Sequence, residues 1–146
     1  MPDPKFQFQV DHVGVAVRSI EEALPCYRKA LGLEAGHREE VASQGVRVAF
    51  LQAGQASIEL LEPIGEEGPV AKFLRLRGPG LHHVAFRAGE LAAQMERLRR
   101  AGLPPIESAP RPGARGHQVC FLPPRQAAGV LVELVSGGPG SLPSSR

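Results

Sequence analysis

The sequence predicts an α+β fold made of two tandem β-α-β-β-β modules, at residues 10–63 and 80–135, within a single domain of 146 residues. Two observations predict this fold. Four short segments recur in the same order about 70 residues further along the chain, and in both copies a helical pattern follows the first apolar segment. The matched segments are HVGVAV 12–17 with HVAF 83–86, LGL 31–33 with AGL 101–103, VAFL 48–51 with VCFL 119–122, and IEL 58–60 with VEL 132–134. Such a repeat indicates duplicated halves.

The first module begins with an apolar strand and continues into a helix expected over residues 19–31. Ser19 is a suitable N-cap, and Glu22 follows three residues later as in a capping box. Gly32 comes directly after the last helical residue, where glycine commonly ends a helix. The apolar segments that follow are expected to form the remaining strands.

The second module repeats this order, with a helix expected over residues 89–101. Leu91, Met95 and Leu98 share one face of that helix, and Gly102 ends it. The pattern therefore predicts that this face packs on the second group of strands.

A connector at residues 64–79 separates the modules and contains a helical pattern at 69–76 between Gly-Pro breakers. Residues 136–146 have almost no apolar side chains to bury, so they are expected to form a disordered tail.

Strand parity separates two polar residues from the apolar face of the first module. Side chains alternate between the two faces of a strand. The side chains expected to pack against the helix are Val13, Val15 and Val17 in the first strand and Ile58 and Leu60 in the last. His12 and Glu59 are therefore expected together on the opposite face.

The second module gives the same result. The side chains expected to pack are Val84 and Phe86 in the first strand and Val130, Val132 and Leu134 in the last. His83 and Glu133 are expected on the other face, whereas His82 has the opposite parity and is not expected to be a ligand.

Isolated imidazoles and carboxylates in apolar strands are unfavourable to bury unless they are paired or bound to a metal. Taken singly, such a His is more often a hydrogen-bonded structural residue, and such a Glu more often faces solvent. The matching positions in both halves favour a His2Glu2 site for a divalent ion, formed by His12, Glu59, His83 and Glu133. In six-coordinate geometry these ligands leave two positions for oxygen donors.

These residues and motifs resemble the vicinal oxygen chelate superfamily, and within it most closely the methylmalonyl-CoA epimerases. The resemblance extends from about residue 10 to 135 and includes the segments DHVGVAV, EALPCYRKALGL, QGVRVAFL, IELLEP, GPVAKFLRLRGPGLHHVAF and GVLVELV. It implies the vicinal oxygen chelate fold, in which the two modules form a cup-shaped mixed sheet around a metal site.

The activity implied by the resemblance is that of an isomerase. It is the metal-dependent epimerisation of (R)- and (S)-methylmalonyl-CoA by proton abstraction at C2, through a metal-stabilised enolate. The family's metal ligands fall on His12, Glu59, His83 and Glu133, and Glu133 is also the implied base. Relatives often have Gln at the position of Glu59. The expected cofactor is a divalent ion, Co2+ first, with Ni2+, Mn2+, Zn2+ or Mg2+ as alternatives.

Inversion at C2 requires a proton to be removed from one side of the carbon and returned to the other, by two groups or by one mobile group. Some relatives have a Glu directly after the QGVx stretch, but here that residue is Val48, which cannot titrate. Gln44, Glu40 and a bound water are all candidates for the second group, and the sequence does not choose between them.

The segment RPGARGHQVCFLPPRQAAGV resembles the substrate-side loop of the family, where relatives often have an HPKS-like run. Here the run is PPRQ at 123–126, so Arg125 stands where Lys is common. Arg125 and His117 are candidates to bind a substrate carboxylate or a CoA phosphate, with solvated surface as an equal alternative. Gln44 is a third candidate for substrate binding.

The composition and charge of the chain limit the kinds of partner and the location that we expect. A formal net charge of +2 gives no strong field toward nucleic acid or membranes, so a small-molecule acyl-CoA substrate is expected. Cys26 and Cys120 belong to no metal or redox motif and are expected to be reduced. The N-terminus lacks a leader pattern, and no apolar stretch approaches the roughly 20 residues that span a bilayer. We therefore expect a cytoplasmic protein, and the resemblance implies a homodimer.

Two other functions are alternatives. A glyoxalase I-like lyase acting on a thiol hemithioacetal also needs a metal and a Glu base. A binding protein of the same fold that sequesters a drug typically lacks the metal ligands, so the presence of all four argues against it. The metal content of the purified protein separates the binding protein from the enzymes.

Overall fold

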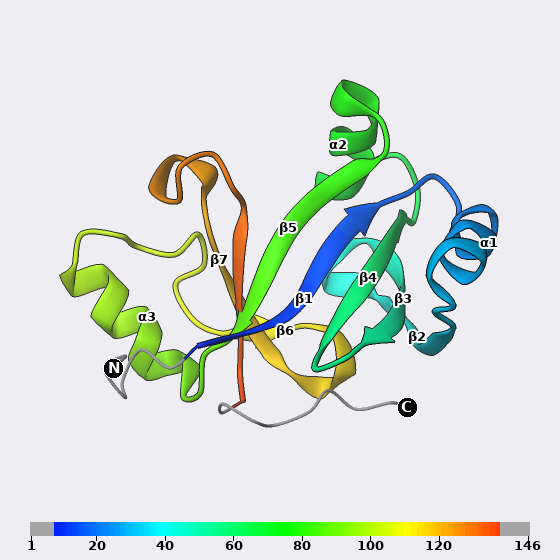
Figure 1. The fold of residues 1–146 in the computed structure, drawn as a ribbon. Coiled ribbons are helices and arrows are strands. Elements are labelled where there is room, and N and C mark those ends of the chain that lie inside the picture. Colours follow the sequence, from blue (N-terminus) through cyan, green and yellow to red (C-terminus); the bar gives the residue numbers. More distant parts are fainter. Residues whose placement is uncertain (1–7, 138–146) are drawn as a thin grey trace. The chain divides into compact units, whose positions relative to one another are not determined.

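The structure is a computed structural model that describes residues 8–137 of the chain. The chain divides into two compact units (Figure 1). The first unit is residues 12–82, and the second combines residues 8–11 with residues 83–137. The boundaries fall inside two strands, between Asp11 and His12 and between His82 and His83.

The first unit contains one sheet with strand order β2-β3-β4-β1. The two outer pairings, β2 with β3 and β3 with β4, are antiparallel, and β1 is parallel to β4. Its elements are β1 (Gln9–Ala16), α1 (Ile20–Leu31), β2 (Ala35–Val41), the 3-10 turn η2 (Ala42–Gln44), β3 (Val46–Ala53), β4 (Ala56–Pro63) and α2 (Pro69–Arg77). The predicted β-α-β-β-β order and the connector helix are confirmed.

The second unit repeats this topology with strand order β5-β8-β7-β6. Strand β5 is parallel to β8, and the other pairings are antiparallel. Its elements are β5 (Gly80–Arg87), α3 (Leu91–Arg100), β6 (Arg111–Pro112), the 3-10 turn η3 (Ala114–Gly116), β7 (Gln118–Leu122), the 3-10 turn η4 (Pro124–Gln126) and β8 (Val132–Val135).

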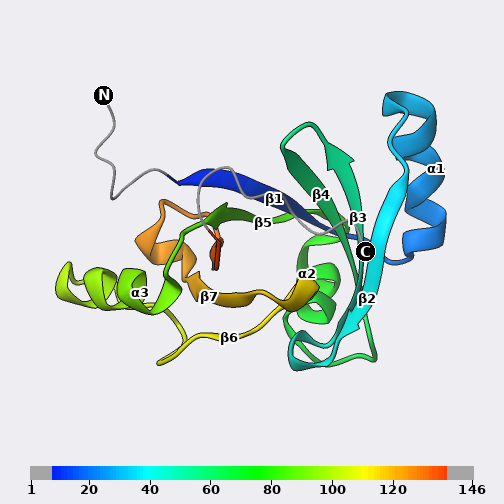
Figure 2. The same cartoon turned by 90° about the horizontal axis from the view of Figure 1, so that it is seen from below.

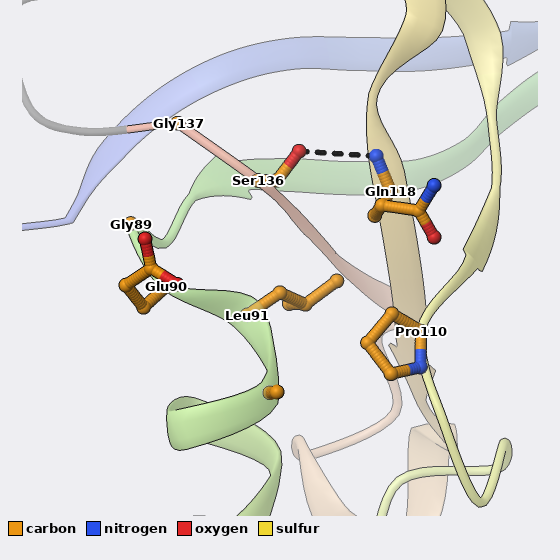
Figure 3. Close-up of a pocket in the computed structure, with 8 residues that line it drawn as sticks. Gly89, Glu90, Leu91, Pro110, Gln118, Ser136 and Gly137 are labelled. Atoms are coloured by element: carbon orange, nitrogen blue, oxygen red, sulfur yellow. Dashed lines mark hydrogen bonds between the residues drawn. The ribbon is translucent and has the colours of Figure 1, made fainter.

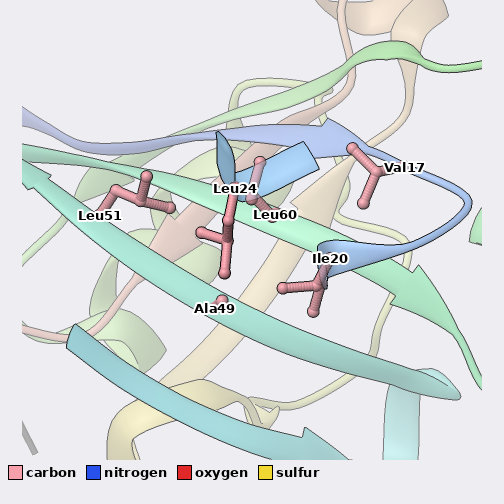
Figure 4. Packing of buried hydrophobic residues seen from close by; sticks show 6 residues of the cluster. All are labelled: Val17, Ile20, Leu24, Ala49, Leu51 and Leu60. Atoms are coloured by element: carbon pink, nitrogen blue, oxygen red, sulfur yellow. The ribbon is translucent and has the colours of Figure 1, made fainter. Parts of the chain in front are cut away.

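Helix α1 packs on one face of the first sheet, which we call its helix face. Figures 1 and 2 both show the helix outside the strands of this unit. The buried cluster beneath it contains Val17, Ile20, Leu24, Ala49, Leu51 and Leu60 (Figure 4). Burying a large apolar side chain contributes roughly 1.5–3 kcal/mol, so this cluster is what fixes the helix against β3 and β4.

Both ends of α1 have the signals that the sequence predicted. The Ser19 hydroxyl accepts a hydrogen bond from the Glu22 N–H at 3.2 Å. The Glu62 carboxylate, from β4, accepts one from the Ile20 N–H at 2.8 Å. Gly32 has a φ of 68° and ends the helix in the left-handed conformation. Two N–H groups of the first turn are thereby satisfied, although Pro25 interrupts the helix interior.

In the second unit, α3 presents the predicted face to the sheet. Leu91, Met95 and Leu98 pack with Cys120 of β7 and Leu134 of β8 in one buried cluster. The same division of the sheet into a helix face and an opposite face therefore exists in both units.

Two predictions at the end of the chain need correction. Val130 is not a packing residue of the last strand: it is 44% exposed, and β8 begins only at Val132. The cause is a turn in which the Val130 N–H donates to the Ala127 carbonyl at 3.1 Å. Ser136 and Gly137, expected to start the disordered tail, are instead paired: the Ser136 N–H donates to the Gln118 carbonyl at 2.9 Å, and Gly137 pairs with Gly89 in an isolated bridge. Residues 138–146 lie outside the described part of the chain.

None of the helices in residues 8–137 is long and apolar enough to cross a membrane.

Candidate functional site

The first unit holds His12 and Glu59 together on the face of its sheet opposite the helix. Parallel pairing of β1 with β4 sets Gly14 opposite Glu59 and His12 opposite Ser57. His12 Nε2 lies 3.1 Å from Glu59 Oε1, and both side chains are buried. We call this face of each sheet the site face.

The second unit holds His83 and Glu133 in the same way. Parallel pairing of β5 with β8 sets Ala85, two residues after His83, opposite Glu133. His83 Nε2 lies 3.1 Å from Glu133 Oε1, and these side chains are buried as well. The structure thus brings each predicted pair together, with the register and the separation repeated from one unit to the other.

A phenylalanine accompanies each pair. Phe50 of β3 is opposite Glu59, and Phe121 of β7 is opposite Glu133. The His12 ring meets Phe50 edge-on, with centroids 5.6 Å apart and an interplanar angle of 88°. His83 meets Phe121 at 6.0 Å and 84°. Each of the two histidines therefore contacts both a carboxylate and a phenylalanine ring.

The surroundings of the two pairs are apolar. In the first unit, Val46, Val48 and Leu61 are buried and share the site face. In the second unit, Ala85, Val119 and Val135 are buried around Phe121. A carboxylate in such surroundings is stable only when it is well paired, and an imidazole nitrogen beside a carboxylate oxygen is a donor set that divalent ions prefer.

Strand β2 brings a second His–Glu pair to the first unit, and the sequence analysis did not identify it. His37 Nε2 lies 2.6 Å from Glu39 Oε1, and the side chains are 17% and 29% exposed. A register shift between Ala35 and Arg38 changes which residues share a face. Ala35 packs in the helix-face cluster, yet His37 and Glu39, two and four residues later, lie on the site face.

The other candidates from the sequence lie at separate places. Gln44 ends the 3-10 turn before β3 and is half-buried. Glu40 faces away from the site face, because it binds Arg47 Nε at 3.0 Å and Arg38 on the same face binds Glu21 of α1. Glu40, one of the three candidates for the second acid/base group, therefore does not lie on the site face.

The substrate-side candidates belong to the second unit. His117 is half-buried directly before β7, and Arg125 is exposed in the 3-10 turn after it.

His82, in the first unit, packs edge-on against Phe73 of α2, with ring centroids 5.1 Å apart. This position agrees with the prediction that His82 is not a metal ligand.

A pocket of about 440 Å³ lies where α3 begins in the second unit (Figure 3). The Gln118 N–H donates to the Ser136 hydroxyl at its edge, at 3.0 Å. It is lined by Gly89, Glu90, Leu91, Ala92, Pro110, Gln118, Ser136 and Gly137. No histidine lines it, and neither member of the His83–Glu133 pair does, so we assign the pocket no part in the chemistry.

Comparison with known proteins identifies the family to which the chain is similar. Residues 11–121 match the model of the Glyoxalase/Bleomycin resistance protein/Dioxygenase superfamily. The chain is 44% identical to YqjC of Bacillus subtilis, over 86% of this chain and 90% of that protein. It is 39% identical to the ethylmalonyl-CoA/methylmalonyl-CoA epimerase of Cereibacter sphaeroides, over 86% of this chain and 96% of the relative.

A solved structure agrees with these relatives. A variant of Streptomyces coelicolor methylmalonyl-CoA epimerase in complex with 2-nitronate-propionyl-CoA superposes with a TM-score of 0.86 and 34% identity. The match covers 89% of this chain and 97% of that one.

Proposed function

The chain belongs to the glyoxalase/bleomycin resistance protein/dioxygenase superfamily and, within it, to the methylmalonyl-CoA epimerases, and from this membership we propose that it interconverts (R)- and (S)-methylmalonyl-CoA. The observation that carries the proposal is the buried His–Glu pair that recurs in both units with one register and one separation. A structural His–Glu contact would not need to recur in this way.

The two pairs together would hold one divalent ion. His12, Glu59, His83 and Glu133 each offer a ligand atom and are all buried. Two imidazoles and two carboxylates suit a borderline or hard divalent ion. Such an ion, when bound, supplies a Lewis acid that polarises the thioester carbonyl and makes the C2 proton more acidic.

Glu133 would take the proton from one side of C2. The carbon lies between a thioester and a carboxylate, so the electron pair of the C–H bond moves to the thioester oxygen as the proton leaves. The Glu133 side chain is buried, and Phe121 lies opposite it on β7. The contact with His83 holds the carboxylate in one orientation.

Three further residues are proposed to bind the substrate. Arg125 and His117 would receive the carboxylate or a CoA phosphate, since a guanidinium binds such groups through two parallel hydrogen bonds. The exposure of Arg125 supports this role, because the side chain is accessible. Gln44, at the turn before β3, is the third. Cobalt as the ion, a homodimer and a cytoplasmic location stay predictions.

The glyoxalase-like alternative gains no support from the relatives. The Cereibacter sphaeroides protein and the Streptomyces coelicolor structure are both named epimerases, which favours an acyl-CoA substrate over a hemithioacetal.

Proton NMR in D2O tests the proposed function. We expect metal-loaded protein to remove the C2 proton signal of racemic methylmalonyl-CoA at turnover rates. Glu133→Ala, which removes a proposed metal ligand as well as the base, should abolish that exchange. Glu96→Gln, an exposed change on α3, should leave it intact. Absence of exchange with the wild-type protein loaded in turn with Co2+, Ni2+, Mn2+, Zn2+ and Mg2+ would overturn the proposal.

A further inference from the structure

We propose that Glu39, oriented by His37, is the second acid/base group of the reaction, acting on the side of C2 opposite Glu133. The assignment rests on the proposed function and names a group that it leaves open.

The register of β2 places Glu39 beside Val48, the position at which some relatives have a Glu. Glu39 and Val48 are directly opposite each other in the antiparallel pair of β2 with β3. Side chains opposite each other share a face, with Cβ atoms about 4.5–5.5 Å apart. A carboxylate on Glu39 therefore reaches the same region of the site face as a side chain at residue 48, but from the neighbouring strand.

That region adjoins a metal-ligand pair. Phe50, two residues after Val48, is opposite Glu59 and meets the His12 ring at 5.6 Å. The His37 ring lies on the other side of the same phenylalanine, with centroids 6.2 Å apart. One aromatic ring thus separates the His37–Glu39 pair from the His12–Glu59 pair.

The pair itself has the properties that proton transfer requires. The 2.6 Å separation of His37 Nε2 and Glu39 Oε1 is that of a strong hydrogen bond, which holds the carboxylate in one orientation. Both side chains are partly exposed, so a substrate can reach the carboxylate and protons can exchange with water.

The other charged residues of β2 have separate functions. Arg38 and Glu40 are exposed on the helix face, where they pair with Glu21 and Arg47. Glu39 is therefore the carboxylate of this strand that faces the site. The register shift between Ala35 and Arg38 produces this orientation.

The equivalent position in the second unit carries a different charge. Arg111 of β6 is opposite Val119, as Glu39 is opposite Val48. Its guanidinium lies over the Phe121 ring at 5.4 Å and binds Glu107 at 3.2 Å. The two units therefore share a framework, and the first unit alone has a carboxylate at this place among residues 8–137.

The proton balance closes with two carboxyl groups. For one epimer, the Glu39 carboxylate accepts the C2 proton, and the C–H electron pair moves to the thioester oxygen to give the enolate. A protonated Glu133 then donates its proton to the opposite side of C2, and the electron pair returns to the carbon. Glu39 ends protonated and Glu133 ionised, the state that converts the other epimer or resets by exchange with water.

Separate epimers in D2O test the assignment, with inversion and loss of the C2 proton followed in parallel. Removing one of two bases should slow inversion by at least about 100-fold, the usual contribution of a positioned acid/base group. In Glu39→Gln, exchange should persist from one epimer, whose proton Glu133 removes, and be lost from the other. Glu40→Gln, on the opposite face of the same strand, should behave as the wild type.

His37 is a positioning residue in this scheme, and conservative rescue tests it. His37→Ala should lower the exchange that depends on Glu39, and His37→Gln, whose amide N–H can still bond Glu39, should restore most of it. Metal content and thermal unfolding of Glu39→Gln should match the wild type, which separates loss of a base from loss of the site.

The outcomes distinguish the two proposals. A wild-type protein that neither exchanges nor inverts either epimer would overturn the proposed function. If the wild type is active, the behaviour of Glu39→Gln decides the Glu39 assignment alone. Inversion within about three-fold of the wild-type rate, or equal loss of exchange from both epimers, would overturn that assignment and leave the proposed function standing.

Discussion

At the scale of single residues, Asp11 is the carboxylate of a buried ionic cluster in the second unit. Arg115 Nη2 lies 2.9 Å from one Asp11 oxygen, and Arg87 Nε lies 3.7 Å from the other. Each side chain is at most 2% exposed. Arg115 also has a φ of 58°, so its loop adopts a left-handed conformation that the cluster helps to hold.

We expect Asp11→Ala to lower the free energy of unfolding by about 3–5 kcal/mol, because two guanidinium groups would stay buried without that carboxylate. Urea denaturation measures the change. Glu96→Ala is the control, since its pairs with Arg99 and Arg100 are exposed and should contribute less than about 1 kcal/mol. Equal effects of the two substitutions would show that the buried cluster adds no stability.

The two cysteines should differ in reactivity. Burial raises the pKa of the Cys120 thiol to about 12, and the negative charges of Glu107 and Glu133 add to the shift. Cys26 is exposed on α1. Because the thiolate is the reactive form, one thiol per chain should react with DTNB at pH 8 in the native protein and two in denaturant. Native Cys26→Ser should not react; rapid reaction of two thiols in the native wild type would contradict the burial of Cys120.

At the scale of elements, the helix starts offer a matched test of capping. Ser19 caps α1 through its hydroxyl, whereas Glu90 is the N-cap of α3 and makes no such hydrogen bond. Ser19→Ala should destabilise the protein by about 1 kcal/mol, and Glu90→Ser should stabilise it by up to about 1 kcal/mol. Thermal unfolding of both variants measures the shifts. Shifts of the same sign would contradict the role of the side-chain cap.

The elements also show what the sequence could predict. Helix α1 has a cap, an apolar face and a terminal glycine that act locally, so its range was predicted almost to the residue. The pairs His12–Glu59 and His83–Glu133 follow from alternation along regular strands. Glu39 escapes the same argument because the irregularity after Ala35 reverses the parity of β2. Such a shift depends on pairing with β3, and residues distant in sequence set that pairing.

A departure from regular strand geometry also explains why Val130 was wrongly predicted to pack. The segment GVLVELV has an alternating pattern throughout, but Ala128 has a φ of 55° and Gly129 one of 94°. The chain turns there, and the strand begins two residues after Val130. Local alternation predicts the face of a residue only where the backbone is extended.

At the scale of the whole molecule, two copies of one framework carry different residues on their outer strands. The His–Glu pair, the facing phenylalanine and the strand order are the same in both units. The outer strands differ, with His37 and Glu39 in one unit and Arg111 in the other.

Metal stoichiometry tests whether the two units act as one site. If both pairs bind the same ion, elemental analysis after equilibration with Co2+ should give one ion per chain, and His12→Ala or His83→Ala should each abolish tight binding. Saturation at 100 times the dissociation constant should stabilise the wild type by about 2.7 kcal/mol and neither variant. Independent pairs would instead bind two ions per chain, and each variant would keep one. The unfolded chain has the same ligands but lacks the fold that aligns them, so the ion stabilises the folded chain. If the ion is shared, replacing the histidine of one unit removes the stabilisation by the ion from both units.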